Sequence, residues 1–390
     1  MIMKEWFDLI PVDEMIEWRH HIHQNPELSF EEYQTAQYVE DHLKSFGNIE
    51  IVRPTPTSVL GTLKGKYEGK TILLRADMDA LPMQEEGDIE FKSVVKDVAH
   101  TCGHDTHTAM LLATAKVLSS LQDQLHGSVK FIFQHAEEKN PGGAKEIIET
   151  GLLYGVDAVL GLHIIPRLEA GTLHMVLEGP ATTAADGFFL NIQGKGSHGS
   201  MPQNGIDPII VGTQVVSQLQ TIPSRYTTPG ELVVVSVGEF KSGDAPNIIP
   251  DKAYMSCSIR TVNEETRQKV AKRIQDIIEN TCSTYGATYD LDYIFSYPAI
   301  INDKDFSKVV FDSAKEALGD SQVFETTISS ASEDFAYYRN IAPVCFAFLG
   351  GGSVEQGCEF ANHHPKFRII DESMINGVKA EVQTVLNFLK

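Results

Sequence analysis

The sequence predicts an α/β protein with two domains: a larger one built on a mixed, largely parallel sheet, and a smaller α+β domain inserted into it. Three observations predict this arrangement. The chain has 390 residues, more than one hydrophobic core usually serves. Strand-like and helix-like segments alternate in the first half, which is typical of parallel sheets covered by helices. The pattern changes near Thr183, and helix and strand signals of the first kind resume from Pro298.

The first part of the larger domain begins with helical spacing over residues 12–46 and continues with apolar, β-rich runs that alternate with helical segments. The strand-like runs are 71–75, 128–133 and 158–161, and the helical segments are 106–121 and 143–149. The inserted domain has strand-like runs at 187–192, 232–237 and 253–259, with helices at 207–219 and 264–280. A last apolar strand is predicted at 344–349. The larger domain is therefore predicted to comprise 1–182 and 297–390, and the inserted domain 183–296.

The composition argues against several classes of protein. Hydrophobic residues make up 42% and charged residues 22% of the chain, as in ordinary globular proteins and unlike disordered ones. The net charge is −21, which argues against a nucleic-acid partner. Residues 1–11 lack the pattern of a signal peptide and no long uncharged apolar run follows, so we expect a cytoplasmic protein that does not bind membranes. The five cysteines are odd in number and scattered, which argues against a disulfide framework.

The segment from His100 to His107 concentrates a thiol, imidazoles and a carboxylate just before a predicted helix. Only a glycine separates Cys102 from His104, so an extended chain places both side chains on one side, able to chelate one metal ion or to bridge two. Taken alone, such a pair is more often a core cysteine beside a helix-capping segment. His107 lies one turn into the helix, and we interpret it as a packing or supporting residue.

Further donors follow the other strand-like runs. Glu137 and Glu138 lie just beyond the run at 128–133, and His163 lies just beyond the run at 158–161. Adjacent carboxylates can divide their tasks, one binding cations and the other moving protons. His363 and His364 precede a proline, which favours at least one functional histidine there. Taken singly, adjacent glutamates are usually solvated charge and a lone histidine is usually a hydrogen-bonded core residue.

The combined set is stronger than its members. Asp79, Glu137 and His163 all follow strand-like runs. The carboxyl ends of parallel strands meet at one edge of a sheet, where ligands bind. Together the residues supply nitrogen, oxygen and sulfur donors in a number suited to two divalent ions. Two such ions polarise a carbonyl, lower the pKa of water and stabilise a developing oxyanion, which suits hydrolysis of a stable amide.

With these motifs the sequence closely resembles the peptidase M20 family, in particular its amidohydrolase branch, which includes N-acyl-amino-acid deacetylases, hippurate hydrolases and plant auxin-conjugate hydrolases. The resemblance covers nearly the whole chain. It rests on ordered motifs at residues 19–30, 75–82, 100–107, 134–138, 161–163 and 363–367. It implies a metallopeptidase-like catalytic domain carrying an inserted lid or dimerisation domain.

The resemblance implies a role for each residue singled out above. The implied ligands of the two divalent ions are Cys102, His104, Glu138, His163 and His363. Glu137 is implied as the general base, and Asp79 as the carboxylate that orients a ligand. His363 is preferred to His364 because the branch has a His-x-Pro spacing.

Two positions depart from the wider family. That family has a histidine ligand where this chain has Asp77, and a bridging aspartate where this chain has Cys102. Both departures match the amidohydrolase branch. A thiolate ligand favours Zn²⁺, whereas carboxylate and imidazole donors also admit Mn²⁺, Co²⁺ or Ni²⁺.

The inserted domain carries the residues that the resemblance assigns to the substrate. His198, in the motif 194–202, is implied to reach the substrate oxyanion, in its own subunit or in a partner. Asn247 and Arg260 are implied to hold the substrate carboxylate, a task that suits the planar donors of arginine. The alternative for Arg260 is a surface salt bridge. The resemblance also implies a homodimer or homotetramer formed through this domain.

The predicted activity is hydrolysis of N-acyl amino acids, in the first place N-acetyl amino acids, to a free carboxylate and an amino acid. In this mechanism Glu137 takes a proton from the attacking water and returns it to the leaving amine. The nearest alternative is an aminopeptidase or dipeptidase of the same family. A more distant alternative is a non-catalytic metal-binding or regulatory protein that keeps the fold.

Overall fold

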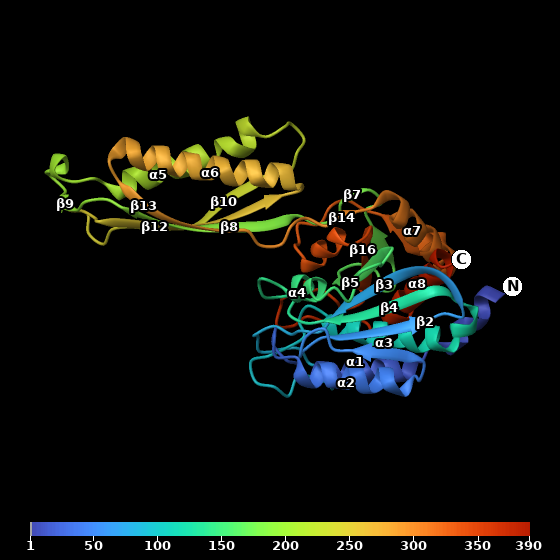
Figure 1. Cartoon of the computed structure of the whole chain (residues 1–390). Coiled ribbons are helices and arrows are strands. Elements are labelled where there is room, and N and C mark those ends of the chain that lie inside the picture. Colours follow the sequence, from blue (N-terminus) through green and yellow to red (C-terminus); the bar gives the residue numbers. More distant parts are fainter. Residues whose placement is uncertain (1) are drawn as a thin grey trace. The chain divides into compact units, whose positions relative to one another are not determined.

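The computed structural model describes residues 2–390, with side chains from Trp6 onward. Contacts divide the chain into two compact units. Unit 1 comprises Met1–Ala181, Ile301–Ile328 and Asp334–Lys390, and unit 2 comprises Thr182–Ile300 and Ser329–Glu333 (Figure 1). The chain leaves unit 1 after Ala181 and returns to it at Ile301, each within a few residues of a predicted domain boundary. The short return of 329–333 to unit 2 had no signal in the sequence.

Unit 1 is built on an eight-stranded sheet with the order β1-β2-β4-β3-β5-β16-β6-β15. The strands are β1 (Ile49–Val52), β2 (Val59–Lys64), β3 (Tyr67–Asp77), β4 (His126–Gln134), β5 (Ala158–Pro166), β6 (Leu173–Met175), β15 (Val323–Glu325) and β16 (Val344–Gly352). The central strands β4, β3, β5 and β16 are mutually parallel, while β1, β2 and β6 add antiparallel pairs. The prediction of a mixed, largely parallel sheet is confirmed.

The apolar runs of the sequence form the buried centre of this sheet. Residues 72–76 of β3 and the whole of β16 are buried. A parallel strand that is covered on both faces buries successive side chains, so its sequence is continuously apolar rather than alternating. The runs at 71–75, 128–133 and 344–349 therefore correspond to β3, β4 and β16. β3 and β4 extend beyond both predicted ends, and β16 extends beyond its C-terminal end.

Helices cover the sheet of unit 1. They are α1 (Val12–Gln24), α2 (Tyr33–Ser45), α3 (His104–Ser120), α4 (Gly143–Glu149), α7 (Lys304–Leu318) and α8 (Ser373–Phe388). Short helices lie at η1 (Ile2–Leu9), η2 (Gln122–Gln124), η5 (Asp320–Gln322) and η6 (Asp334–Asn340), and β7 (Gly179–Pro180) pairs with β14 (Ile301–Asn302). α3 packs against β3, α1, α2 and α8, and is therefore buried on nearly every side. Among the described residues, no helix is long and apolar enough to cross a membrane.

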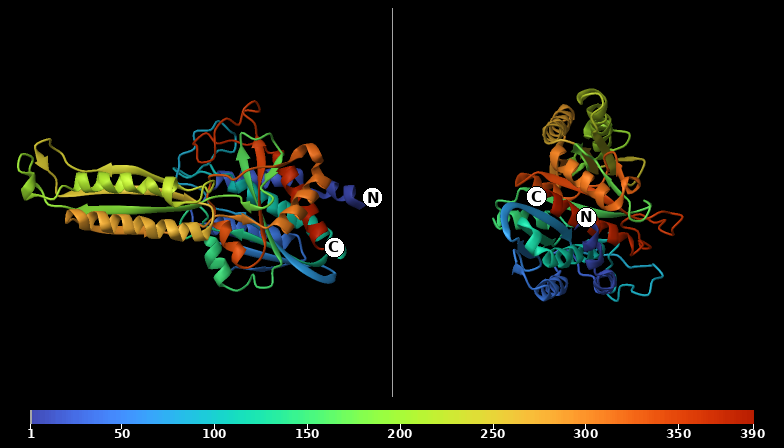
Figure 2. Two further views of the ribbon diagram at one scale, coloured as in Figure 1. Left: turned by 90° about the horizontal axis from the view of Figure 1, so that it is seen from above. Right: turned by 90° about the vertical axis from the view of Figure 1, so that its right-hand side faces the viewer.

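Unit 2 is an antiparallel four-stranded sheet with two long helices on the same side of it (Figures 1 and 2). The sheet has the order β10 (Val234–Lys241), β12 (Lys252–Thr261), β8 (Ala184–Gln193) and β13 (Thr288–Ile294). The helices are α5 (Pro208–Leu219) and α6 (Glu264–Tyr285), and η3 (Pro202–Asn204), η4 (Ile222–Tyr226), β9 (Ser197–His198) and β11 (Ile248–Ile249) lie in the connections. Every second residue of β8 and β12 is buried, as expected for a sheet covered on one face. β13 was not predicted.

Glu381 of α8 lies in the contact between α8 and α3. Its side chain is buried, and its Oε2 accepts a hydrogen bond from Thr114 Oγ1 at 2.6 Å. Burial raises the pKa of Glu381 to about 7. Because the pKa is higher in the folded chain than in the unfolded chain, ionisation destabilises the fold. This cost begins as the pH rises through the unfolded pKa near 4.5 and reaches its full size, up to about 3 kcal/mol, above pH 7.

Glu381→Gln keeps an acceptor for Thr114 and removes the charge. We expect the variant to melt several degrees above the parent at pH 8, with a much smaller difference at pH 5, because only the parent carries a buried charge at pH 8. Thermal denaturation at the two pH values measures this, with the exposed Glu149→Gln as the control. A variant that gains no stability at pH 8 relative to pH 5 would contradict the assignment.

Candidate metal centre

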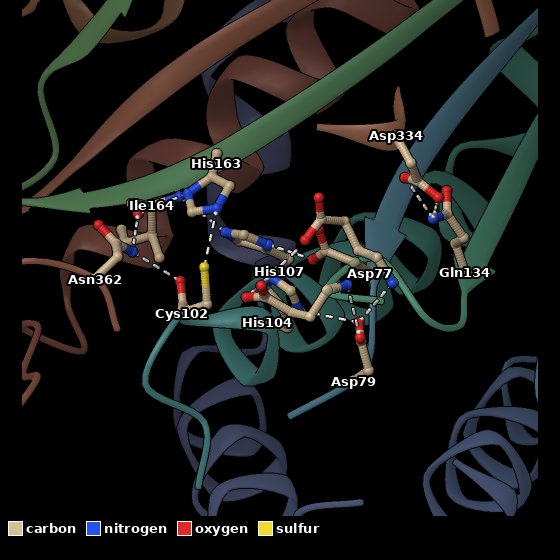
Figure 3. Close-up of polar contacts among 12 residues, drawn as sticks. Asp77, Asp79, Cys102, His104, His107, Gln134, His163, Ile164, Asp334 and Asn362 are labelled. Atoms are coloured by element: carbon tan, nitrogen blue, oxygen red, sulfur yellow. Dashed lines mark hydrogen bonds and ion pairs between the residues drawn. The ribbon is translucent and has the colours of Figure 1, made fainter. Parts of the chain in front are cut away.

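Neighbouring parallel strands of unit 1 bring the predicted donors to one edge of the sheet. β3 ends at Asp77, with Asp79 two residues on, and β4 ends at Gln134, just before Glu137 and Glu138. His163 was predicted to follow its strand, but it lies inside β5, because β5 continues to pair with β16 as far as Pro166. Figure 3 shows Asp77, His107 and His163 close together, with Cys102 and His104 beside them.

The start of α3 supplies the next two donors. The helix was predicted to begin at residue 106, but it begins at His104. The preceding Gly103 has φ 92, a left-handed conformation that glycine adopts without steric cost. This turn places Cys102 two residues before the start of the helix and His104 in its first turn, both buried.

The five predicted ligands fall into two donor groups that share one atom. Cys102, His104 and His163 form one group, and Cys102, Glu138 and His363 form the other; within each group the donor atoms lie within 4.8 Å of one another. Cys102 Sγ is 3.5 Å from His163 Nε2, and Glu138 Oε1 is 3.0 Å from His363 Nε2. Glu137 lies in a further such group with His104 and Glu138. The thiol is therefore placed between two candidate cation positions.

The donor atoms fit divalent cations. Among the described residues, His104 Nε2 is buried and makes no hydrogen bond, and it lies 3.8 Å from Glu138 Oε1, the oxygen that contacts His363. A buried polar atom without a hydrogen bond is costly, and coordination of a cation would satisfy His104 Nε2. Burial and the nearby carboxylates, Glu138 foremost, raise the pKa of the Cys102 thiol well above its ordinary value. A cation at this position would reverse that effect and favour the thiolate.

Asp79 is a hydrogen-bonding centre behind these donors. Its Oδ1 accepts from His104 Nδ1 at 3.2 Å and from the Glu137 N–H at 3.0 Å, and its Oδ2 accepts from the Glu138 N–H at 3.0 Å and from Ser29 Oγ at 2.6 Å. Burial alone would raise the pKa of Asp79, but these contacts, His104 first, hold it below its ordinary value. The Asp79 carboxylate thus orients the His104 ring so that its Nε2 lies on the side of the other donor atoms. Its contact with the backbone of both glutamates had no signal in the sequence.

His107 and Asp77 lie next to the donors with their polar atoms already engaged. Asp77 Oδ1 accepts from His107 Nδ1 and its Oδ2 accepts from Arg75 Nη1, each at 2.5 Å. His107 Nε2 accepts the N–H of Ile164 at 2.8 Å. The Ile164 carbonyl in turn accepts from His163 Nδ1 at 2.9 Å, which leaves His163 Nε2 facing Cys102 (Figure 3). Both ring nitrogens of His107 are thus hydrogen-bonded, and its donor atom also lies within 4.8 Å of donor atoms of Asp77 and His104.

Asn362 is a supporting residue that the sequence analysis missed. Its Nδ2 donates to the carbonyl of Cys102 at 2.9 Å and to that of Ile164 at 3.3 Å (Figure 3). The next residue, His363, has φ 66 and donates its N–H to the Thr101 carbonyl at 2.8 Å. These bonds tie the 362–363 turn to the segment that carries Cys102. The adjacent His-His pair was the only local signal near it.

The two neighbouring histidines of this turn differ in their surroundings. His363 meets Glu138 in the second donor group. His364 stacks on Phe360 with ring centroids 4.2 Å apart, and its Nδ1 accepts the Lys366 N–H at 3.1 Å. The structure thus brings His363 to the donors, and His364 is engaged elsewhere.

The predicted substrate residues lie in unit 2. His198 is exposed on β9, where its Nδ1 accepts from Ser200 Oγ at 2.8 Å, and it lines a pocket of about 540 Å³. The Asn247 carbonyl accepts the Gly199 N–H at 2.8 Å, which ties the two segments together. Arg260, half-buried on β12, makes no ion pair with any residue that the structure describes, so the surface salt bridge considered for it is not seen. The substrate roles of these residues stay predictions.

Comparisons with known proteins agree with the motifs. The model of peptidase family M20/M25/M40 matches residues 73–387. An N-acyl-L-amino acid amidohydrolase of Geobacillus stearothermophilus is 46% identical over 300 residues, covering 77% of this chain and 80% of that protein. Thermostable carboxypeptidase 2 of Saccharolobus solfataricus is 39% identical over 380 residues, covering 96% of this chain and 95% of that protein.

A solved structure gives the same result. The Bacillus subtilis YXEP protein, described as a dinuclear metal binding peptidase of the M20 family, superposes with a TM-score of 0.84 at 34% identity, over 97% of this chain and 98% of that chain. The resemblance that the motifs indicate is therefore confirmed in sequence and in fold. The chain belongs to peptidase family M20/M25/M40.

Proposed function

We propose that this protein is a metal-dependent amidohydrolase that cleaves N-acyl amino acids, in the first place N-acetyl amino acids, to a carboxylate and an amino acid. The observation that carries the proposal is the Cys102 thiol shared by two donor groups, with Glu137 beside them. The likeness to the N-acyl-L-amino acid amidohydrolase supports the substrate class. We also propose that the protein acts in the cytoplasm, as a homodimer or homotetramer formed through unit 2.

The residues that would hold two divalent ions are Cys102, His104 and His163 on one side, and Cys102, Glu138 and His363 on the other. Zn²⁺ suits the shared thiolate, and Mn²⁺, Co²⁺ or Ni²⁺ suits the imidazole and carboxylate donors. Such ions supply Lewis-acid polarisation of the amide carbonyl and lower the pKa of water. Asp79 would keep the His104 ring in the orientation that this binding requires.

Glu137 would move the proton during hydrolysis. Its side chain is largely buried, and the hydrogen bond from its N–H to Asp79 fixes its backbone. As water adds to the amide carbon, the Glu137 carboxylate takes one proton from it. When the C–N bond breaks, the same carboxyl group delivers that proton to the amine nitrogen, so that one water is consumed and a carboxylate and an amino acid are formed.

Unit 2 would supply the contacts to the rest of the substrate. We propose that His198 donates a hydrogen bond to the oxyanion that develops on the carbonyl oxygen, in its own subunit or in the partner's site. Asn247 and Arg260 would bind the carboxylate of the amino acid. Arg260 suits this task because its guanidinium has no carboxylate partner among the described residues.

Peptide hydrolysis is the second candidate, favoured by the likeness to a thermostable carboxypeptidase. A peptide and an N-acyl amino acid share the amide bond and the terminal carboxylate, and differ in the free amino group of the acyl part. An aminopeptidase or dipeptidase would bind that charged amine. A non-catalytic metal-binding protein would hydrolyse neither substrate.

Removal of metal provides the test. We expect treatment with a chelator to lower hydrolysis of N-acetyl-methionine by at least about 100-fold, because the carbonyl would no longer be polarised. Adding back Zn²⁺, Mn²⁺, Co²⁺ or Ni²⁺ singly should restore it to different extents, and release of amino acid from N-acetyl-methionine should exceed that from a simple dipeptide. Faster cleavage of the dipeptide would favour the peptidase. Absence of hydrolysis across an N-acyl amino acid panel in metal-loaded protein would refute the proposed activity.

A further inference from the structure

The turn that carries Glu137 and Glu138 is held through three consecutive backbone N–H groups. The Ala136 N–H donates to Glu32 Oε1 at 2.7 Å. The N–H groups of Glu137 and Glu138 donate to the two oxygens of Asp79 at 3.0 Å each. Ala136 has φ 52, in the left-handed region that costs a residue with a Cβ about 1 kcal/mol or more. Contacts from outside the turn therefore stabilise a conformation that its own sequence does not favour.

Glu32 is an unusual residue to find at this position. It precedes α2, is fully buried, and its second oxygen, Oε2, has no hydrogen-bond partner among the described residues. Burying a carboxyl group with an unsatisfied oxygen costs free energy. Burial and the nearby charge of Asp79 raise the pKa of Glu32 to about 8, so at neutral pH the group is largely uncharged. A glutamate that served only as a surface charge or as a helix cap would not need to be buried in this way.

The segment around Glu32 is itself fixed against the metal centre. The Ala80 N–H donates to the Glu27 carbonyl at 2.8 Å, and Leu28 forms a β-bridge with Ala80. Ser29 Oγ donates to Asp79 Oδ2 at 2.6 Å. Residues 27–32 thus carry one of the two carboxyl groups that bind the 136–138 backbone, that of Glu32, and contact the other, that of Asp79.

We propose that Glu32 is a positioning residue that acts through the Ala136 N–H. By accepting this hydrogen bond it sets the turn that presents the Glu137 carboxylate to the substrate and the Glu138 carboxylate to a metal ion. The roles of these two glutamates rest on the proposed function. The position of the turn does not, because it follows from the hydrogen bonds alone.

Two variants separate this role from a purely structural one. Glu32→Gln keeps a carbonyl oxygen that accepts the Ala136 N–H, whereas Glu32→Leu has a similar volume and no acceptor. Glu32→Asp withdraws the acceptor by one methylene, and it replaces Glu32→Leu if that variant does not fold. Glu31→Leu, at the exposed neighbouring position, controls for loss of an acidic residue in the segment.

Hydrogen exchange of the peptide that contains residues 136–138 tests the geometry directly. We expect amide exchange to accelerate at least tenfold in Glu32→Leu and to match the parent in Glu32→Gln and Glu31→Leu. Zinc binding, measured by competition with a chelator, should weaken about tenfold for one ion in Glu32→Leu, because Glu138 lies on the same turn. Parental exchange and zinc affinity in Glu32→Leu would overturn the proposal.

Kinetics at saturating zinc test the consequence for Glu137. The kcat for N-acetyl-methionine should fall ten- to hundredfold in Glu32→Leu with KM within threefold of the parent, and Glu32→Gln should stay within threefold in both constants. A Gln variant as impaired as the Leu variant would overturn the proposal, because the acceptor would then not be what matters. If the parent hydrolyses no N-acyl amino acid, the proposed function fails, while exchange and zinc binding still decide the role of Glu32.

Discussion

Glu137→Gln is expected to lower kcat for N-acyl amino acids by about 10²–10⁴-fold, with little change in KM and with both metal ions still bound. Glutamine has nearly the same shape as glutamate but accepts no proton from water and returns none to the leaving amine. The backbone of residue 137 would keep its hydrogen bond to Asp79. Steady-state kinetics and metal analysis of the same preparation measure the two parts of this expectation.

The neighbouring glutamate provides the contrast. Glu138→Gln should weaken metal binding, because Glu138 belongs to the donor group with Cys102 and His363, and excess metal should recover part of its activity. The exposed Glu149→Gln should behave as the parent. Full hydrolysis by the Glu137→Gln variant would show that Glu137 does not transfer the proton. Loss of both metal ions from that variant would show that Glu137 is a metal ligand instead.

Cys102→Ala is expected to abolish tight binding of both metal ions and to lower kcat/KM by about 10³-fold or more. The reason is geometric: Sγ is the one atom that belongs to both donor groups, so its removal takes a ligand from each. Metal content after dialysis should fall from two ions per chain to fewer than one. Loaded with Co²⁺, the Cys102→Ala variant should also lack the thiolate-to-metal absorption band that the Co²⁺-loaded parent protein shows.

Variants of other donors and cysteines sharpen this test. His363→Ala removes a residue that belongs to one donor group with Cys102, so it should lose one ion and keep the other. Cys102→Asp supplies oxygen ligands at the same position and should regain part of the binding. Cys282 is a free and buried cysteine of unit 2, and the Cys282→Ala variant should bind metal as the parent does. Two tightly bound ions in Cys102→Ala would exclude a shared thiolate.

Local patterns predicted those parts of the fold that depend on burial and chain direction. The apolar runs became β3, β4 and β16 because strands covered on both faces bury successive residues, as β16 does throughout and β3 and β4 do in their C-terminal parts. The predicted ends of several helices and strands were less accurate. α3 begins two residues earlier than predicted because Gly103 adopts a left-handed conformation, and β5 runs past His163 because β16 pairs with it that far.

The supporting contacts of the centre could not be predicted in this way. Glu32 lies 104 residues from Ala136, and Asn362 lies 260 residues from Cys102. Neither residue carries a periodicity or spacing that relates it to its partner. The contacts of Asp77 had no signal in the sequence either: Arg75 Nη1 and His107 Nδ1 each donate a hydrogen bond to this carboxylate at 2.5 Å.

The sequence by itself determined the largely parallel sheet, the types of donor and the edge at which they gather, because apolar periodicity reports burial and every parallel strand ends at the same edge. Only the tertiary structure decided that Cys102 is common to two donor groups, that Asp79 and Glu32 hold the turn of the two glutamates, and that His363 rather than His364 meets Glu138. Hydrogen bonds and donor distances act over about 3 Å between residues far apart in the chain, and no local pattern encodes such placements.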